Sequence, residues 1–251
     1  MHSEPLVETF NISTLPLAET AALICQNAGS VRAQNVFTMN LDHVVKLRKD
    51  ARFRAVYGRA GLITADGFPV VMACRLRGKR VDRVAGSDLI APISAEAART
   101  GKSIYLFGSN LQVLAKASRV LRERNPGLTI AGQLAPPQNF DPTSQDASRC
   151  VATIGSSGAD LCFVALGAPK QEVFADHGKS LLPNVSFICI GAGLDFIAGA
   201  QVRAPVWMQR YGLEWLWRAA SNPQRLLYRY LLCMGALPGL LARSALIPRR
   251  R

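Results

Sequence analysis

Three short runs place glycine directly after an apolar, strand-like segment and before a helix-like one. They are YLFGSN at 105–110, VALGAPKQE at 164–172 and ICIGAGLDF at 188–196. Glycine lets a ligand approach the backbone, and the open N-terminus of a following helix attracts anions. A single such glycine is often only a turn, but three beside a basic chain favour a nucleotide or phosphate ligand. The residues concerned are Gly108, Ser109, Asn110, Gly167, Pro169, Lys170, Gln171, Gly191, Gly193 and Asp195.

Two details qualify this prediction. Pro169 suits the first helical position of its helix, which would leave Lys170 and Gln171 near the open helix end. None of the three runs is a GxGxxG motif, and no acidic residue follows about 20 positions later to hold a ribose. A nicotinamide-dependent enzyme that uses GAGLDF is therefore only an alternative.

Carboxylates at strand ends are the next candidates for chemistry. Asp66 follows the apolar run LIT and precedes Gly67. A carboxylate there can act as a general base, or it can cap a helix over residues 67–76. Asp195 has a similar position and the same two interpretations. Thr38 and Asn40 end another strand-like run, and Asn40 could equally cap the next helix.

The sequence gives no metal site and no cofactor motif. The three histidines are isolated, and no DxD pair is present to hold Mg²⁺ on a diphosphate. The six cysteines show no CxxC and no metal-ligand spacing. Arrangements of Ser/His/Asp or Cys/His lack supporting spacing, so we set hydrolases aside. We therefore expect neither a bound metal ion nor a cofactor.

The elements that would position these residues alternate between two periodicities. Helix-like stretches, such as residues 111–121, separate the strand-like runs. This alternation predicts an α/β fold, a Rossmann-like parallel sheet flanked by helices. After residue 199 no strand pattern returns, and residues 206–243 are expected to form two helices, the second starting at Pro223. The expected strands are 35–39, 61–64, 103–107, 128–131, 161–166 and 185–190.

Length and composition limit the class of protein. The chain has 251 residues, 49% of them hydrophobic and 19% charged, which excludes a disordered protein. Its longest apolar stretch, 230–242, is 13 residues long and contains glycine and proline, so we expect no membrane span. The first residues lack the basic start and apolar core of a secretory signal. Scattered cysteines in apolar runs suit a reducing compartment, and we expect a cytoplasmic protein.

The positive charge is concentrated at the end of the chain. The net charge is +13, and residues 201–251 contain nine arginines, one acidic residue and no lysine. These arginines alternate with Trp, Tyr and Leu, a composition that suits the headgroup boundary of an anionic membrane. Two helices packed on the sheet would explain the apolar residues equally well. A nucleic-acid-binding module is a further alternative, although no recognised motif supports it.

Several longer motifs resemble one enzyme family. ALGAPKQE, GAGLDFIAG and RAPVWMQRYGLEWLWRAASNPQRLLYRYL are similar to the C-terminal half of the WecG/TagA/CpsF glycosyltransferases. FTMNLDHVVKLRKD, TADGFPVV, VAGSDLI and YLFGSN match in order upstream, so the resemblance covers roughly residues 30–232. It implies an inverting, metal-independent enzyme that moves a sugar from a UDP-sugar to a polyprenyl-diphosphate-linked saccharide in bacterial surface or exopolysaccharide synthesis.

The resemblance also implies roles for individual residues. Asp66 would be the catalytic base, while Thr38, Asn40 and Gln171 would contact the sugars. It implies a catalytic domain over residues 1–200 and a helical, membrane-associating appendage over 201–251, held peripherally on the inner face of the bacterial membrane. The expected partners are thus the UDP-sugar, the lipid-linked acceptor and an anionic membrane, and not nucleic acid. Four arginines of the appendage would hold diphosphates: Arg203, Arg210, Arg218 and Arg225.

Overall fold

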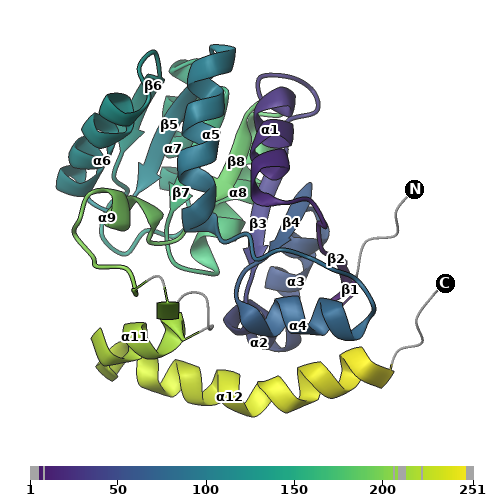
Figure 1. Cartoon of the computed structure of the whole chain (residues 1–251). Helices are drawn as coiled ribbons and strands as arrows, with labels where there is room; N and C mark the ends of the chain where they lie inside the picture. Colours follow the sequence, from purple (N-terminus) through teal and green to yellow (C-terminus); the bar gives the residue numbers. More distant parts are fainter. Residues whose placement is uncertain (1–5, 8, 206, 209–212, 222, 247–251) are drawn as a thin grey trace.

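Six parallel strands form the centre of the molecule in this computed structural model (Figure 1). It describes the backbone of residues 6–7, 9–205, 207–208, 213–221 and 223–246, and the side chains of the same residues except 6–7, 218–221, 223–231 and 246. The sheet order is β4-β3-β8-β7-β5-β6, so the last strand of the sheet in the chain lies in its middle. The strands are β3 (Asn35–Met39), β4 (Leu62–Ala65), β5 (Ser103–Gly108), β6 (Thr129–Leu134), β7 (Leu161–Ala165) and β8 (Ser186–Cys189). A two-stranded hairpin, β1 (Leu6–Val7) and β2 (Phe10–Asn11), precedes them.

Helices cover both faces of the sheet, as a parallel sheet requires. The strands alternate their side chains between two cores. Leu161 and Phe163 point to a core shared with α1, α5, α6 and α9, whereas Cys162 and Val164 point to one shared with α2, α3, α4, α7 and α8. The helices are α1 (Leu17–Asn27), α2 (Leu41–Lys49), α3 (Ala51–Gly58), α4 (Phe68–Leu76), α5 (Gly86–Thr100), α6 (Leu111–Arg124), α7 (Gln145–Ser156), α8 (Lys170–Leu181) and α9 (Gly193–Ile197).

Two further helices, α11 (Glu214–Ser221) and α12 (Pro223–Leu246), follow the sheet domain. Figure 1 shows α12 running beneath α2 and α4, which it contacts, while α11 lies at its start. Leu240 of α12 is buried in the same core as α2 and α4. None of the helices in the described part of the chain combines the length and apolar character that crossing a bilayer requires.

The predicted fold class is confirmed, and the strand boundaries differ by only a few residues. The largest shift is in β6, expected at 128–131 but found at Thr129–Leu134. The second C-terminal helix does begin at Pro223. Residues 207–208 are helical, as expected for a helix starting near 206, and α11 begins at Glu214; residues 206 and 209–212 lie outside the described residues. Pro169 is the N-cap residue of α8 and not its first helical residue, with φ −89° and ψ −1°.

Candidate active site

Most of the residues singled out from the sequence lie in one row along the carboxyl edge of the sheet. Every described strand of the six-stranded sheet except β6 ends within two residues of one of them, because parallel strands all present their carboxyl ends to the same edge. In the order of the strands across the sheet, the row runs from Asp66 after β4 and Asn40 after β3 to Gly191 after β8. It continues with Gly167–Gln171 after β7 and ends with Ser109 and Asn110 after β5.

A cleft opens at one end of this row. It has a volume of about 710 Å³ and is lined by Ser109, Asn110, Leu166 and Lys170, together with the loop over residues 135–140. Lys170 Nζ donates to the carbonyl oxygen of Phe140 at 2.8 Å, which ties the loop to the start of α8. The cleft thus lies beyond β5, β6 and β7, where an open α/β sheet binds its ligands.

Asp195 lies beside this cleft and contacts Ser109. Ser109 Oγ donates to Asp195 Oδ1 at 3.3 Å, and the Ser109 N–H donates to the Ala165 carbonyl oxygen at 3.0 Å. Burial raises the pKa of the Asp195 carboxyl, against an opposing effect of the bond from Ser109. Asp195 is in the first turn of α9, whose N-cap residue is Ala192, so the alternative of a cap is wrong.

Asp66 and Asn40 lie side by side at the other end of the row. The Asp66 N–H donates to the Met39 carbonyl oxygen at 2.8 Å, which fixes the two strand ends together. The N-cap residue of α4 is Gly67, so Asp66 is not the cap that the alternative interpretation required. Asn40 does cap its helix, because its Oδ1 accepts the His43 N–H at 3.0 Å. Thr38 lies within β3 and is only 4% exposed.

Gln171 is buried and links two of the turns. Its Oε1 accepts the Gly191 N–H at 3.0 Å, and its Nε2 donates to Glu172 Oε1 at 2.8 Å. Glu172 is fully buried. The sequence analysis did not single out Glu172 or His43. In the sequence, Glu172 is an ordinary acidic residue in the first turn of a helix, and His43 is an isolated histidine. Only the fold brings them together.

Of the four arginines expected to hold diphosphate, the structure describes the side chain of Arg203. Its Nη1 lies 2.6 Å from Asp88 Oδ1, and Arg83 Nη2 lies 2.9 Å from the other oxygen of the same carboxylate. Arg203 Nε is buried and has no hydrogen-bond partner among the described atoms. Arg210 lies outside the described residues, as do the side chains of Arg218 and Arg225.

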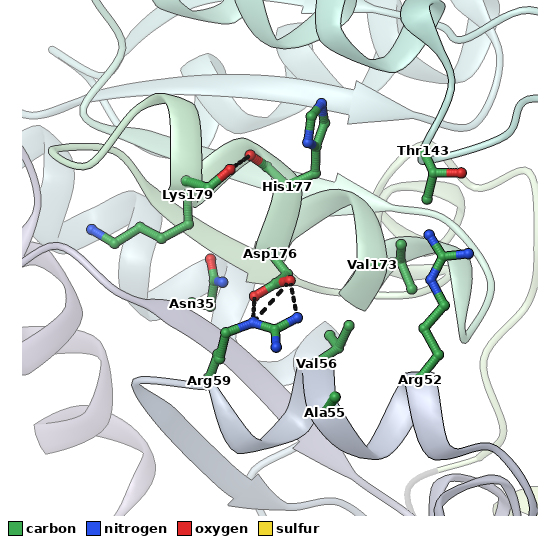
Figure 2. Close-up of a pocket in the computed structure, with 11 residues that line it drawn as sticks. Asn35, Arg52, Ala55, Val56, Arg59, Thr143, Val173, Asp176, His177 and Lys179 are labelled. Atoms are coloured by element: carbon green, nitrogen blue, oxygen red, sulfur yellow. Dashed lines mark hydrogen bonds and ion pairs between the residues drawn. The ribbon is translucent and has the colours of Figure 1, made fainter.

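A second groove, of about 470 Å³, lies between α3 and α8 and is lined by none of the predicted residues. Figure 2 shows Arg59 of α3 meeting Asp176 of α8 there, with Arg59 Nε 2.9 Å from Asp176 Oδ1 and Nη2 2.6 Å from Oδ2. Asn35, at the start of β3, also lines it. Since the site residues follow the other end of β3, this groove is separate from the row.

The buried Glu172 predicts a pH-dependent stability. Burial raises the pKa of its carboxyl from 4.5 to about 7. The folded protein therefore holds this proton more tightly than the unfolded chain, and stability from this group falls as the pH rises from 4.5 to about 7. Glu172→Gln is expected to remove up to roughly 3 kcal/mol of this fall. Urea unfolding of the wild type and of Glu172→Gln near pH 5 and near pH 8 measures the free energy of unfolding. The same change in this free energy between the two pH values in both proteins would contradict the prediction.

Comparisons with known proteins identify the family. The model of the "Glycosyl transferase WecG/TagA/CpsF family" matches residues 7–251. The chain belongs to this family. It is therefore a glycosyltransferase, which decides against the alternatives of a nucleic-acid-binding module and a nicotinamide-dependent enzyme. Among the described residues no three His, Cys, Asp or Glu side chains come together as metal ligands, and metal independence stays a prediction.

Two curated relatives carry the same name, N-acetylglucosaminyldiphosphoundecaprenol N-acetyl-beta-D-mannosaminyltransferase. The one from Bacillus spizizenii is 31% identical over 201 residues, which cover 80% of this chain and 74% of the relative. The one from Bacillus subtilis is 31% identical over 226 residues, which cover 90% and 84%. By their names, both family members transfer a sugar to a lipid-linked diphosphosugar.

Proposed function

We propose that this glycosyltransferase moves a hexose or N-acetylhexosamine-type sugar from a UDP-sugar to a polyprenyl-diphosphate-linked saccharide, with inversion and without a metal ion. One observation carries the proposal. A carboxylate, Asp66, lies in the same row of strand ends as a 710 Å³ cleft rimmed by Ser109, Asn110 and Lys170. Donor and acceptor can therefore meet along one edge of the sheet.

In this reaction Asp66 takes the proton from the acceptor hydroxyl group. The hydroxyl oxygen forms a bond to the anomeric carbon as the bond from that carbon to the UDP oxygen breaks. Attack from the face opposite the leaving group inverts the anomeric centre, which requires one base on the acceptor side. Thr38, Asn40 and Gln171 are proposed to contact the sugars, while the turns after β5, β7 and β8 hold the nucleotide.

The departing diphosphate needs positive charge when no metal supplies it. Arg203, Arg210, Arg218 and Arg225 are proposed to provide it, together with the N–H groups at the start of α8. The buried Nε of Arg203, which has no hydrogen-bond partner among the described atoms, supports this role, because a buried donor left unpaired is costly until a ligand accepts from it.

The test is UDP release from a panel of UDP-sugars in EDTA, with a synthetic polyprenyl-diphosphate-sugar as acceptor. UDP-N-acetylmannosamine comes first, because the relatives are named for that sugar. Acceptor-dependent release from one donor is expected. Activity that appears only when Mg²⁺ is added would contradict the proposed role of the arginines, and no release under either condition would contradict the proposed reaction.

We further propose that residues 1–200 form the catalytic domain and residues 201–251 a helical appendage. The appendage is proposed to hold the enzyme on the inner face of the bacterial membrane. Exposed apolar side chains support this: Trp207, Trp215, Leu216, Leu232 and Met234 are all at least 36% exposed. Aromatic and apolar residues beside arginines suit the boundary between lipid headgroups and acyl chains.

Charge reversal in the appendage is expected to weaken membrane binding. Each basic residue near an anionic surface contributes about 1 kcal/mol, so Arg218→Glu with Arg225→Glu should lower the partition coefficient at least about 10-fold. Flotation with vesicles containing phosphatidylglycerol measures this, and Arg99→Glu on α5 serves as the control. Equal flotation of the wild type and the double variant would contradict the proposal.

A further inference from the structure

A chain of buried polar contacts runs behind the row of strand ends. Tyr57 Oη of α3 lies 2.6 Å from His43 Nδ1 of α2. His43 Nε2 lies 3.7 Å from Glu172 Oε1, which is within reach of an ion pair but too long for a hydrogen bond. The same oxygen accepts from Gln171 Nε2, and Gln171 Oε1 accepts from the Gly191 N–H. The chain therefore joins α3, α2, α8 and the turn after β8.

The two hydrogen bonds at Gln171 fix the orientation of its amide. The Gly191 N–H can only donate, so it selects the oxygen of the Gln171 amide. Glu172 accepts from the amide nitrogen, and the amide is thereby held in one of its two possible orientations. The amide nitrogen of Gln171 carries two hydrogens, and Glu172 accepts a hydrogen bond from one of them. The second is held in a fixed direction by the same two contacts.

The position of Glu172 costs stability. Its side chain has no exposure, and Oε2 has no hydrogen-bond partner among the described atoms. Burying an ionisable group that is incompletely paired is unfavourable, and such groups concentrate where they serve a reaction. Asp176, one turn further along α8, instead meets Arg59 at the surface. The helix thus carries one acid in an ordinary surface pair and one in the interior behind the site.

We propose that Glu172 is a positioning residue for sugar transfer. Glu172 faces His43 and orients the Gln171 amide toward the Gly191 turn. The proposed sugar-contacting residue, Gln171, and the proposed nucleotide-binding turn at Gly191 are thereby held in a fixed position relative to each other. This inference rests on the proposed function.

The electrostatic surroundings of Glu172 make the arrangement depend on pH. Burial raises the pKa of Glu172 to about 7, so its charge changes near neutrality. The ionised carboxylate is the stronger acceptor for Gln171. We therefore expect kcat to rise with pH through about 7. The other ionisable groups facing this cluster are Asp42 and Lys46 of α2, Tyr57 of α3, Cys189 of β8 and Asp66 after β4.

The experiment compares pH profiles of acceptor-dependent UDP release. Glu172→Gln keeps an oxygen that accepts from Gln171 but cannot ionise. We expect its kcat near pH 8 to be roughly 10-fold lower, with the KM for the UDP-sugar little changed and the rise through neutrality absent. Asp176→Asn, which removes an acid from the same helix at the surface, is the matched control and should keep the wild-type profile.

A second variant guards against misfolding of the first. Tyr57→Phe removes only the hydroxyl group that contacts His43 and keeps the ring between Phe37 and Phe53, whose centroids lie 5.1 and 5.0 Å away. In Tyr57→Phe, the pH at the midpoint of the rise in kcat is expected to shift by about half a unit, since His43 loses the Tyr57 hydroxyl as a partner.

Two results would overturn the inference. One is a wild-type kcat and pH profile in both variants. The other is a loss of activity that only follows the loss of folded protein in thermal unfolding while the profile stays unchanged. Either result, in a wild type that transfers sugar, leaves the proposed function standing. A wild type that transfers no sugar would contradict the proposed function and this inference with it.

Discussion

Replacing Asp66 by asparagine is expected to lower the kcat of sugar transfer by roughly 10²–10⁴-fold and to leave the protein folded. Asparagine has nearly the same size but cannot take a proton from the acceptor hydroxyl group. The substitution removes no helix cap, because Gly67 is the N-cap residue of α4. The measurement is acceptor-dependent UDP release at saturating donor, with thermal unfolding recorded on the same samples.

The control for this variant is Asp82→Asn, at an exposed aspartate on the segment that follows α4. It removes the same charge from the same region and is expected to leave kcat unchanged. Near-normal turnover by a folded Asp66→Asn protein would show that the base is another group.

The largest expected loss of stability comes from a single methyl group at Gly108. This glycine has φ +114°, and a Cβ atom there would lie 2.2 Å from the Ala165 carbonyl oxygen and 2.6 Å from its carbon. Both neighbours are backbone atoms of the paired strand β7, so they cannot move aside easily. Gly108→Ala is expected to lower the free energy of unfolding by roughly 2–5 kcal/mol. Urea unfolding measures it.

Gly167→Ala provides the matched control, at the corresponding turn of the neighbouring strand. No described atom lies within 4 Å of a Cβ atom at this position, and its φ is not positive. Its free energy of unfolding should stay within about 0.5 kcal/mol of the wild type. Equal losses in the two variants would show that the close approach of β5 to β7 is not the cause.

The positions of the strands, and the edge of the sheet at which the candidate site residues lie, could be predicted because the parallel sheet is buried on both faces. Continuous apolar runs such as residues 161–166 signal such strands directly, and the polar residue after each run must lie at the carboxyl edge. The helix boundaries could not be predicted from the local sequence alone. Pro169 fits the first helical position by its fixed φ, yet the tertiary structure places it one residue before the helix.

The interior partners of the site could not be predicted from spacing. His43 and Glu172 lie 129 positions apart in the chain and meet only because β8 brings the end of β7 beside the end of β3. A first-turn glutamate looks like an ordinary favourable charge at a helix N-terminus, and nothing local shows that it is fully buried. Likewise, Asp88 gave no sign that it would bridge Arg83 and Arg203.

The place of β8 in the sheet has a consequence for how the enzyme is made. β3 with β4 and β7 with β5 and β6 form two groups, and among the described strands only β8 pairs with both. β8 is also the last of the six to leave the ribosome. A nascent chain that stops before Ser186 therefore holds both groups of strands but nothing that joins them, and it still lacks the Gly191 turn and the C-terminal arginines of the candidate site. Since domains form from the N-terminus during synthesis, the six-stranded sheet must wait for this one late strand, and the two separate groups of strands expose pairing edges to other chains until it arrives.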